Sequence, residues 1–239
     1  MRIALLTSGG GTTMAAIISA CKEGVLQNVI PALVIASKED AGSIAKARTL
    51  GISEKDILVI NPKSFETREA FGEKIIAECR ARNVEFIGQY GWMVKTPENV
   101  IAAFPNMIVN QHPGPLDQGK LDFGGPGMYG MRVHQTRLCF VQKTNREFWT
   151  EATSHRVVGE YDKGAIVGRE RVPILSDDTT ETLQSRVLPV EHAVQIKTLQ
   201  DFANGTVQEY HREEPLILPG EEVLFEECKE NAIKLYPHG

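Results

Sequence analysis

The sequence predicts an α/β protein with a Rossmann-like sheet that is open, twisted and mostly parallel, with helices on both faces and an antiparallel C-terminal portion. Short apolar runs alternate with helical patterns from the first residues onward. Most of these runs are apolar without interruption, as is typical of strands covered on both faces. One of them, at residues 107–109, ends in Asn110, Gln111, His112 and Pro113, as a strand does where it reaches a ligand site at the carboxyl edge of a sheet.

The N-terminal half has the periodicity of a βαβαβ mononucleotide unit. Phe71, Ile75 and Cys79 recur at helical spacing, for example, and Ser64 precedes that helix. Strands are predicted at residues 3–7, 29–36, 56–60 and 84–88, the last continuing to 93, and helices after residue 13 and at 41–50, 66–82 and 96–103.

The second half is less regular. Residues 117–130 are rich in Gly, Asp and Pro and predict a long surface loop of the kind that often has a function. The remaining predictions are a helix at 132–136, strands at 138–142, 153–158 and 165–174, a hairpin or insertion at 143–151, a helical stretch at 179–204 kinked or split by Pro189, a peripheral strand or hairpin at 207–218 and a solvated terminal helix.

Composition excludes several classes of protein. The 239 residues carry a formal net charge of −5 and no Lys/Arg-rich block, so we expect no nucleic-acid binding through a basic surface. No apolar run is long enough for a membrane span or a signal peptide. The four cysteines are scattered without a CxxC pair, which indicates a reduced, cytoplasmic protein without a zinc or other metal site. We expect small-molecule substrates and a monomer or homodimer.

A glycine-rich loop follows the first predicted strand and leads into a helix with apolar residues at Met14, Ile17 and Ile18. Backbone amides near Gly11, the hydroxyls of Thr12 and Thr13 and the positive end of the helix would hold a phosphate well. The loop is neither a Walker A motif nor GxGxxG. The alternative is a tight βα turn that is merely rich in glycine.

Asn110 and His112 are two residues apart in an extended segment, so both side chains can face one reacting group. Each also has a structural interpretation, because Asn, His and Pro are common where a strand turns. His155 lies in a strand pattern, and Asp162 lies in a turn where such a residue most often caps the backbone. Glu191, just after Pro189, can point into a site or into solvent, and composition favours the exposed position.

Together these residues resemble the folate-dependent formyltransferases, most closely the phosphoribosylglycinamide formyltransferases. The similarity runs from residue 1 to about 207 and includes the loop at residues 8–14, the helix start at 65–71, the segment 90–93 and the segment 190–193. The Asn-x-His-Pro motif with a later Asp is common to formyltransferases of this fold, whereas the phosphate loop is found in fewer of them and is the more specific feature. The resemblance implies a formyltransferase domain at 1–207, with a phosphate-binding half at 1–105 and a catalytic half at 106–207, and a peripheral extension at 208–239.

The resemblance also implies an activity, namely transfer of the formyl group of 10-formyltetrahydrofolate to the amine of 5-phosphoribosylglycinamide in purine biosynthesis, without a metal. The chemistry needs donors to an oxyanion and a proton relay. The resemblance implies a supporting role for His155, and it implies that Glu191 is an acidic residue beside the amine substrate. The other implied roles are catalysis by Asn110, His112 and Asp162, phosphate binding by Gly11, Thr12 and Thr13, and cofactor binding by Arg68, Trp92, Met93 and Val94.

The chain departs from the family pattern after His112, where the stretch to His155 is about a dozen residues longer, and at Lys163, where a glycine is usual. Val94 stands where the family has an arginine. Alternatives therefore remain open: another amine acceptor, a catalytically degenerate ligand-binding relative, or a nucleotide-dependent oxidoreductase on the Rossmann-like half.

Overall fold

The computed structural model describes residues 1–239, which divide into two compact units. Unit 1 consists of Met1–Gln111, Arg156–Gly159 and Gln195–Val207, and unit 2 consists of His112–His155, Glu160–Val194 and Gln208–Gly239. The chain therefore passes between the units several times, and helix α6 (Thr180–Asn204) has residues in both.

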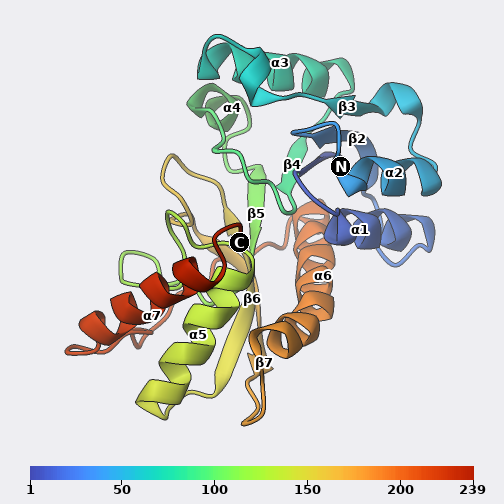
Figure 1. The fold of residues 1–239 in the computed structure, drawn as a ribbon. Helices are drawn as coiled ribbons and strands as arrows, with labels where there is room; N and C mark the ends of the chain where they lie inside the picture. The colour runs from blue at the N-terminus through green and yellow to red at the C-terminus, as the bar shows by residue number, and fades with distance from the viewer. The chain divides into compact units, whose positions relative to one another are not determined.

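Unit 1 contains parallel strands in the order β3-β2-β1-β4-β5, connected by helices (Figure 1). The strands are β1 (Arg2–Thr7), β2 (Ile30–Ala36), β3 (Ile57–Val59), β4 (Phe86–Gln89) and β5 (Ile108–His112), whose last residue begins unit 2. The helices are α1 (Thr12–Lys22), α2 (Gly42–Thr49), α3 (Arg68–Ala81) and α4 (Glu98–Ala103), with short 3-10 turns at Glu54–Asp56 and Pro62–Ser64. All of these helices and strands were predicted, and the side chain of Thr67 caps α3.

Helices cover both faces of the parallel sheet in unit 1. Leu6 and Ile87 belong to an apolar cluster that includes Phe71 of α3. Phe86, the neighbour of Ile87 in β4, instead packs on Phe202 of α6 with ring centroids 4.7 Å apart. Because successive strand residues point to opposite faces, α3 and the end of α6 lie on opposite sides of β4.

Unit 2 contains the antiparallel pair β6 (Trp149–Arg156, whose last residue belongs to unit 1) and β7 (Ile166–Pro173), with α5 (Met131–Thr144), α7 (Glu222–Leu235) and the first part of α6. The strands predicted at 153–158 and 165–174 are therefore confirmed, although the first of them begins earlier, at Trp149. The fold class is confirmed as well, because the strands are mostly parallel and those of the C-terminal portion are antiparallel.

The predicted strand at residues 138–142 is wrong, because α5 continues through it to Thr144. Of the segment 143–151, predicted as a hairpin or insertion, the first residues end α5 and the last begin β6. The helix places Leu138 and Val141 in one buried cluster of unit 2 and Cys139 and Phe140 in another. A helix with apolar contacts on two sides has no continuous polar face. Its four-residue apolar run therefore has the local pattern of a buried strand.

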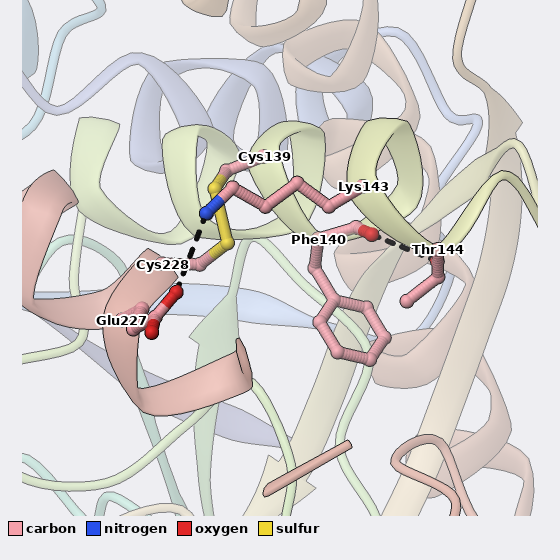
Figure 2. Close-up of a disulfide and its surroundings, with 6 residues drawn as sticks. All are labelled: Cys139, Phe140, Lys143, Thr144, Glu227 and Cys228. Atoms are coloured by element: carbon pink, nitrogen blue, oxygen red, sulfur yellow. Dashed lines mark hydrogen bonds and ion pairs between the residues drawn. A yellow bond between two sulfur atoms is a disulfide. The ribbon is translucent and has the colours of Figure 1, made fainter. Parts of the chain in front are cut away.

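A disulfide joins Cys139 of α5 to Cys228 of α7 (Figure 2). The expectation of four reduced cysteines is therefore wrong for this pair, whereas Cys21 and Cys79 are unpaired on α1 and α3. The prediction of a solvated terminal helix is also wrong, because Phe225 and Cys228 of α7 are fully buried. Sequence spacing does not reveal such a pair, since the contact depends on how two distant helices pack.

Two further predicted strand segments are absent. Residues 90–93 do not continue β4, because Gly91 turns the chain with φ of +69°. Residues 207–218 contain only an isolated bridge between Tyr210 and Ile166.

The other irregular features agree with the sequence. Residues 117–130 contain no helix or strand, and α6 is a single helix with Pro189 inside it. None of the helices combines the length and the apolar character needed to cross a membrane.

Candidate active site

Strand β5 carries Asn110 and His112 to the carboxyl edge of the parallel sheet. The register pairs Leu6 of β1 with Gln89 of β4, and Gln89 with Asn110 of β5, so these strands end together. Asn110 is half-buried and His112 is only 3% exposed. Both lie in one strand two positions apart, on the same side of it, as the sequence predicts.

Asp162 lies beside His112 within unit 2, in the turn between β6 and β7. Its Oδ2 is 3.8 Å from Nδ1 of His112, and its Oδ1 is 3.2 Å from Nε2 of His155. The amide of Gly125 donates to Oδ2 at 2.8 Å. Asp162 has φ of 56°, a left-handed conformation that Asp tolerates better than most residues. The turn thus brings together three residues singled out in the sequence.

The ring of His112 is fixed by the long loop at 117–130. Its Nε2 donates to the carbonyl oxygen of Phe123 at 3.0 Å. A carbonyl oxygen can only accept, so Nε2 carries a proton. Nδ1 is then the ring atom that can gain or lose a proton, and it is the atom that faces Asp162.

Burial and charge act in opposite directions on this cluster. Burial is the strongest influence on His112 and lowers its pKa, whereas Asp162 acts to raise it. Burial also opposes ionisation of Asp162, but His112, His155 and the Gly125 amide outweigh it and hold the pKa of Asp162 well below its usual range. We therefore assign a carboxylate at Asp162 and a neutral His112. The charge of Asp162 thus favours the protonated form of His112, but burial has the larger effect and the pKa of His112 is lowered overall.

A third histidine, which the sequence analysis did not single out, lies close to this cluster. His134 of α5 is 1% exposed, and burial, followed by the charge of His112, lowers its pKa to about 4. Its Nδ1 is buried without a hydrogen-bond partner. A lone histidine in a helical pattern gives no signal of this position, because only the packing of α5 determines its burial.

The glycine loop has a geometry that only glycine fits at one position. Gly11 precedes α1 with φ of 66°, and a Cβ there would lie 2.5 Å from Cβ of Ser43. No side chain caps the first turn of α1, so its amides are not used by a capping residue. Thr12 is exposed, whereas Thr13 is buried.

A cavity of about 420 Å³ in unit 1 is lined by residues implied by the resemblance and by their neighbours. Arg68, Met93 and Val94 contribute to its wall, together with Lys95. Trp92 does not line this cavity, because it is 7% exposed and packs in the apolar cluster against Phe71. Trp92 is thus a core residue behind the wall of this cavity.

Glu191 is only 4% exposed, so the expectation of an exposed carboxylate is wrong. His192, next in the chain, is half-buried. Composition near Pro189 suggested a solvated stretch, but α6 is packed in unit 2 through Leu183, Val187 and Val194.

The fold and this cluster define an α/β protein suited to acid–base chemistry at the end of a parallel strand. The chain matches the formyl transferase family over residues 1–199 and belongs to that family.

Several relatives of the chain are phosphoribosylglycinamide formyltransferases. The chain is 30% identical to the chloroplastic phosphoribosylglycinamide formyltransferase of Arabidopsis thaliana over 83% of its own length and 64% of that protein. It is 26% identical to the phosphoribosylglycinamide formyltransferase of Escherichia coli, over 87% of this chain and 90% of the relative. It spans 64% and 60% of the lengths of the two plant relatives from Arabidopsis thaliana and Vigna unguiculata.

Solved structures have the same fold. Glycinamide ribonucleotide transformylase 1 from Symbiobacterium toebii superposes with a TM-score of 0.73 at 30% identity, covering 86% of this chain and 88% of that one. Phosphoribosylglycinamide formyltransferase from Brucella melitensis superposes with a TM-score of 0.71 at 31% identity, covering 87% of this chain and 98% of that one. These similarities favour a formyltransferase over the oxidoreductase alternative.

Proposed function

We propose that this protein transfers the formyl group of 10-formyltetrahydrofolate to the amine of 5-phosphoribosylglycinamide, a step of de novo purine biosynthesis. The observation that carries the proposal is the buried contact of Asp162 with His112 and His155 in a chain of the formyl transferase family. Relatives named as phosphoribosylglycinamide formyltransferases support this acceptor.

In this reaction the acceptor nitrogen attacks the formyl carbon, the bond from that carbon to the folate nitrogen breaks, one proton leaves the amine and one reaches the folate nitrogen. Asn110 donates to the developing oxyanion, and His112 stabilises it or exchanges a proton at Nδ1. Asp162 is a carboxylate that favours the protonated form of His112. His155 contacts Asp162 and supports its orientation.

The proposed phosphate site is the loop at Gly11, with Thr12 and Thr13. The amides of the first turn of α1 and the positive end of its dipole favour a bound anion. Binding the phosphate there would fix the rest of the acceptor and lower the entropic cost of bringing its amine to the formyl carbon. We place Glu191 on the amine and ribose side of the acceptor.

The folate is proposed to bind near Arg68, Met93 and Val94, with Trp92 supporting that wall from the core. A cavity of about 420 Å³ with apolar surface and the cations of Arg68 and Lys95 suits a flat ring system that carries carboxylates. The cofactor supplies the activated formyl group. No step in this proposal requires a metal.

The main alternative is that the protein formylates an amine acceptor other than 5-phosphoribosylglycinamide. The long loop after His112 gives the chain more residues near the cluster than the family pattern implies, and its Phe123 and Gly125 contact His112 and Asp162. Such a loop can change which amine fits. A degenerate relative that binds ligands without turnover is a further alternative.

The test is a product assay with 10-formyltetrahydrofolate and a panel of amines: 5-phosphoribosylglycinamide, its dephosphorylated form and unrelated primary amines. Formylation of the phosphorylated acceptor, with loss of about a hundredfold or more in His112→Ala and Asn110→Ala, is the expected result. Preference for another amine would identify the second acceptor, and folate binding without any product would identify a degenerate relative.

We also propose cytoplasmic localisation, a monomer or homodimer, and the assignment of residues 1–207 to the formyltransferase domain and 208–239 to an extension. The family match over residues 1–199 supports the domain assignment. Sedimentation of the purified protein and imaging of a tagged chain would test the first two. Expression of residues 1–207 alone would test the third.

A further inference from the structure

The loop at 117–130 contacts both proposed catalytic side chains with its backbone. The Phe123 carbonyl accepts from Nε2 of His112 at 3.0 Å, and the Gly125 amide donates to Oδ2 of Asp162 at 2.8 Å. Between them, Gly124 passes so close that a Cβ would lie 2.8 Å from Cβ of Asp162. The path of this short backbone segment therefore determines how both side chains are held.

One buried carboxylate fixes that path. Oδ1 of Asp122 accepts from the Gly124 amide at 3.0 Å, and Oδ2 accepts from the Asp117 amide at 3.0 Å. Its side chain is 2% exposed, and Nζ of Lys163 lies 3.2 Å from Oδ2. Lys163 directly follows Asp162 in the chain. Asp122 is therefore connected to the turn of Asp162 both through the loop backbone at Gly124 and through Lys163.

We propose that Asp122 is a positioning residue for the proposed formyl transfer: with Lys163 it holds the loop in the path that presents the Phe123 carbonyl and the Gly125 amide to His112 and Asp162. The inference rests on the proposed function. It joins the two departures noted in the sequence, the longer loop and the lysine in the Asp162 turn, since these segments contact each other through Asp122 and Lys163. Asp122 itself does not touch reacting atoms in this role.

A purely structural role is the competing interpretation. The bond from Oδ1 of Asp122 to the amide two residues later is a common turn arrangement, and its loss would then reduce stability alone. A positioning role also predicts a change at His112, which a turn residue need not cause. The two are therefore separable by a measurement at the histidine ring.

Asp122→Asn tests the proposal with little change in size. The amide nitrogen of Asn cannot accept from a backbone amide, so one of the two bonds to Asp117 and Gly124 is lost and the ion pair with Lys163 disappears. We expect kcat to fall about tenfold or more, with KM for both substrates within about twofold of the native value, as for residues that hold a catalytic group. Lys163→Met should have a smaller effect in the same direction.

The readout at the ring is the Nε2–H signal of His112, measured by NMR in the protein without substrates. In the native protein it should be protected from exchange by its bond to Phe123, and in Asp122→Asn it should shift and exchange faster. Lys120→Met is the matched control, because Lys120 lies in the same loop, is 42% exposed and has its Nζ 3.9 Å from Asp117 rather than at Asp122. It should leave both kcat and the signal unchanged.

A native kcat and an unchanged His112 signal in folded Asp122→Asn would overturn the proposal, even if its melting temperature were lower. If Asp122→Asn does not fold, the same two measurements on Lys163→Met decide, and native values there overturn it. The ring signal does not depend on turnover. A native protein that formylates no amine would therefore remove the proposed function while the His112 measurement still reports on the loop.

Discussion

Asp162 contacts two histidines and one backbone amide from a left-handed turn position. A capping residue needs only the amide. The additional ring contacts, and a pKa held well below the usual range against burial, indicate a carboxylate whose charge matters to the neighbouring imidazoles.

The first prediction concerns this charge. Asp162→Asn should lower the His112 pKa further, because the largest influence that raises it is removed, and should reduce turnover by about a hundredfold or more. NMR titration of His112 and the pH–rate profile measure both effects. Asp177→Asn, at an exposed aspartate of unit 2, is the control. An unchanged pKa together with an unchanged rate would leave Asp162 as a turn residue only.

The second prediction concerns the phosphate loop. Gly11→Ala should raise KM for the phosphorylated acceptor by about tenfold or more, because its Cβ would lie 2.5 Å from Ser43 and its φ is 66°. Gly9→Ala is the matched control, since a Cβ at Gly9 meets nothing within 4 Å. Equal losses with the dephosphorylated acceptor would argue against a phosphate site in this loop.

At the scale of elements, α5 connects the catalytic cluster to the C-terminal helix. It carries His134 near its start and Cys139 in its middle, and the disulfide to Cys228 ties it to α7. Arg132 of α5 also donates to the carbonyls of Tyr236, Pro237 and Gly127. The segment after residue 207 is therefore part of the packing around α5.

The third prediction follows from that connection. Cys139→Ala/Cys228→Ala, or a reductant, should lower the free energy of unfolding by about 2–5 kcal/mol, because the bridge closes a long loop in the unfolded chain. Thermal unfolding with and without reductant measures the effect. Cys21→Ala should show the same response to reductant as the native protein, since Cys21 is unpaired. Four reactive thiols in the denatured, unreduced protein would contradict the disulfide.

At the scale of the molecule, the buried histidines should make the fold sensitive to acid. The pKa of His134 is lowered to about 4, and that of His112 is also lowered, so folding favours the neutral rings. A lowered pKa contributes stability that is complete above the unfolded pKa, about 6.5 for His, and is lost as the pH falls toward the folded value. Asp162 also contributes stability, because its pKa is lowered in the folded protein. This contribution is lost at lower pH, below about 4, where the carboxylate takes up a proton in the unfolded chain.

The fourth prediction is that the free energy of unfolding decreases between about pH 6.5 and pH 4, and that His134 alone accounts for on the order of 3 kcal/mol of this decrease. His134→Gln should flatten the decrease. His211→Gln, at an exposed histidine, should not. Urea unfolding at intervals of pH measures all three proteins, and identical pH profiles would show that His134 is not buried as a neutral ring.

The sequence by itself determined the features that depend on local pattern. Uninterrupted apolar runs identified β1, β2, β4 and β5, helical spacing identified α3, and the strand-ending Asn110 and His112 marked the edge of the sheet. Asp162 and His155 were singled out through a resemblance, because nothing local in a turn aspartate indicates its distant partner.

Only the tertiary structure decided the rest. Part of the α5 sequence has the pattern of a strand because its apolar residues pack in two separate clusters. The pairing of Cys139 with Cys228 depends on how α5 and α7 pack. The burial of Glu191 and the lowered pKa of His112 likewise arise from distant segments that remove these side chains from water. Short-range periodicity indicates the average solvent exposure of a segment, whereas the surroundings of one side chain depend on residues far away in the chain.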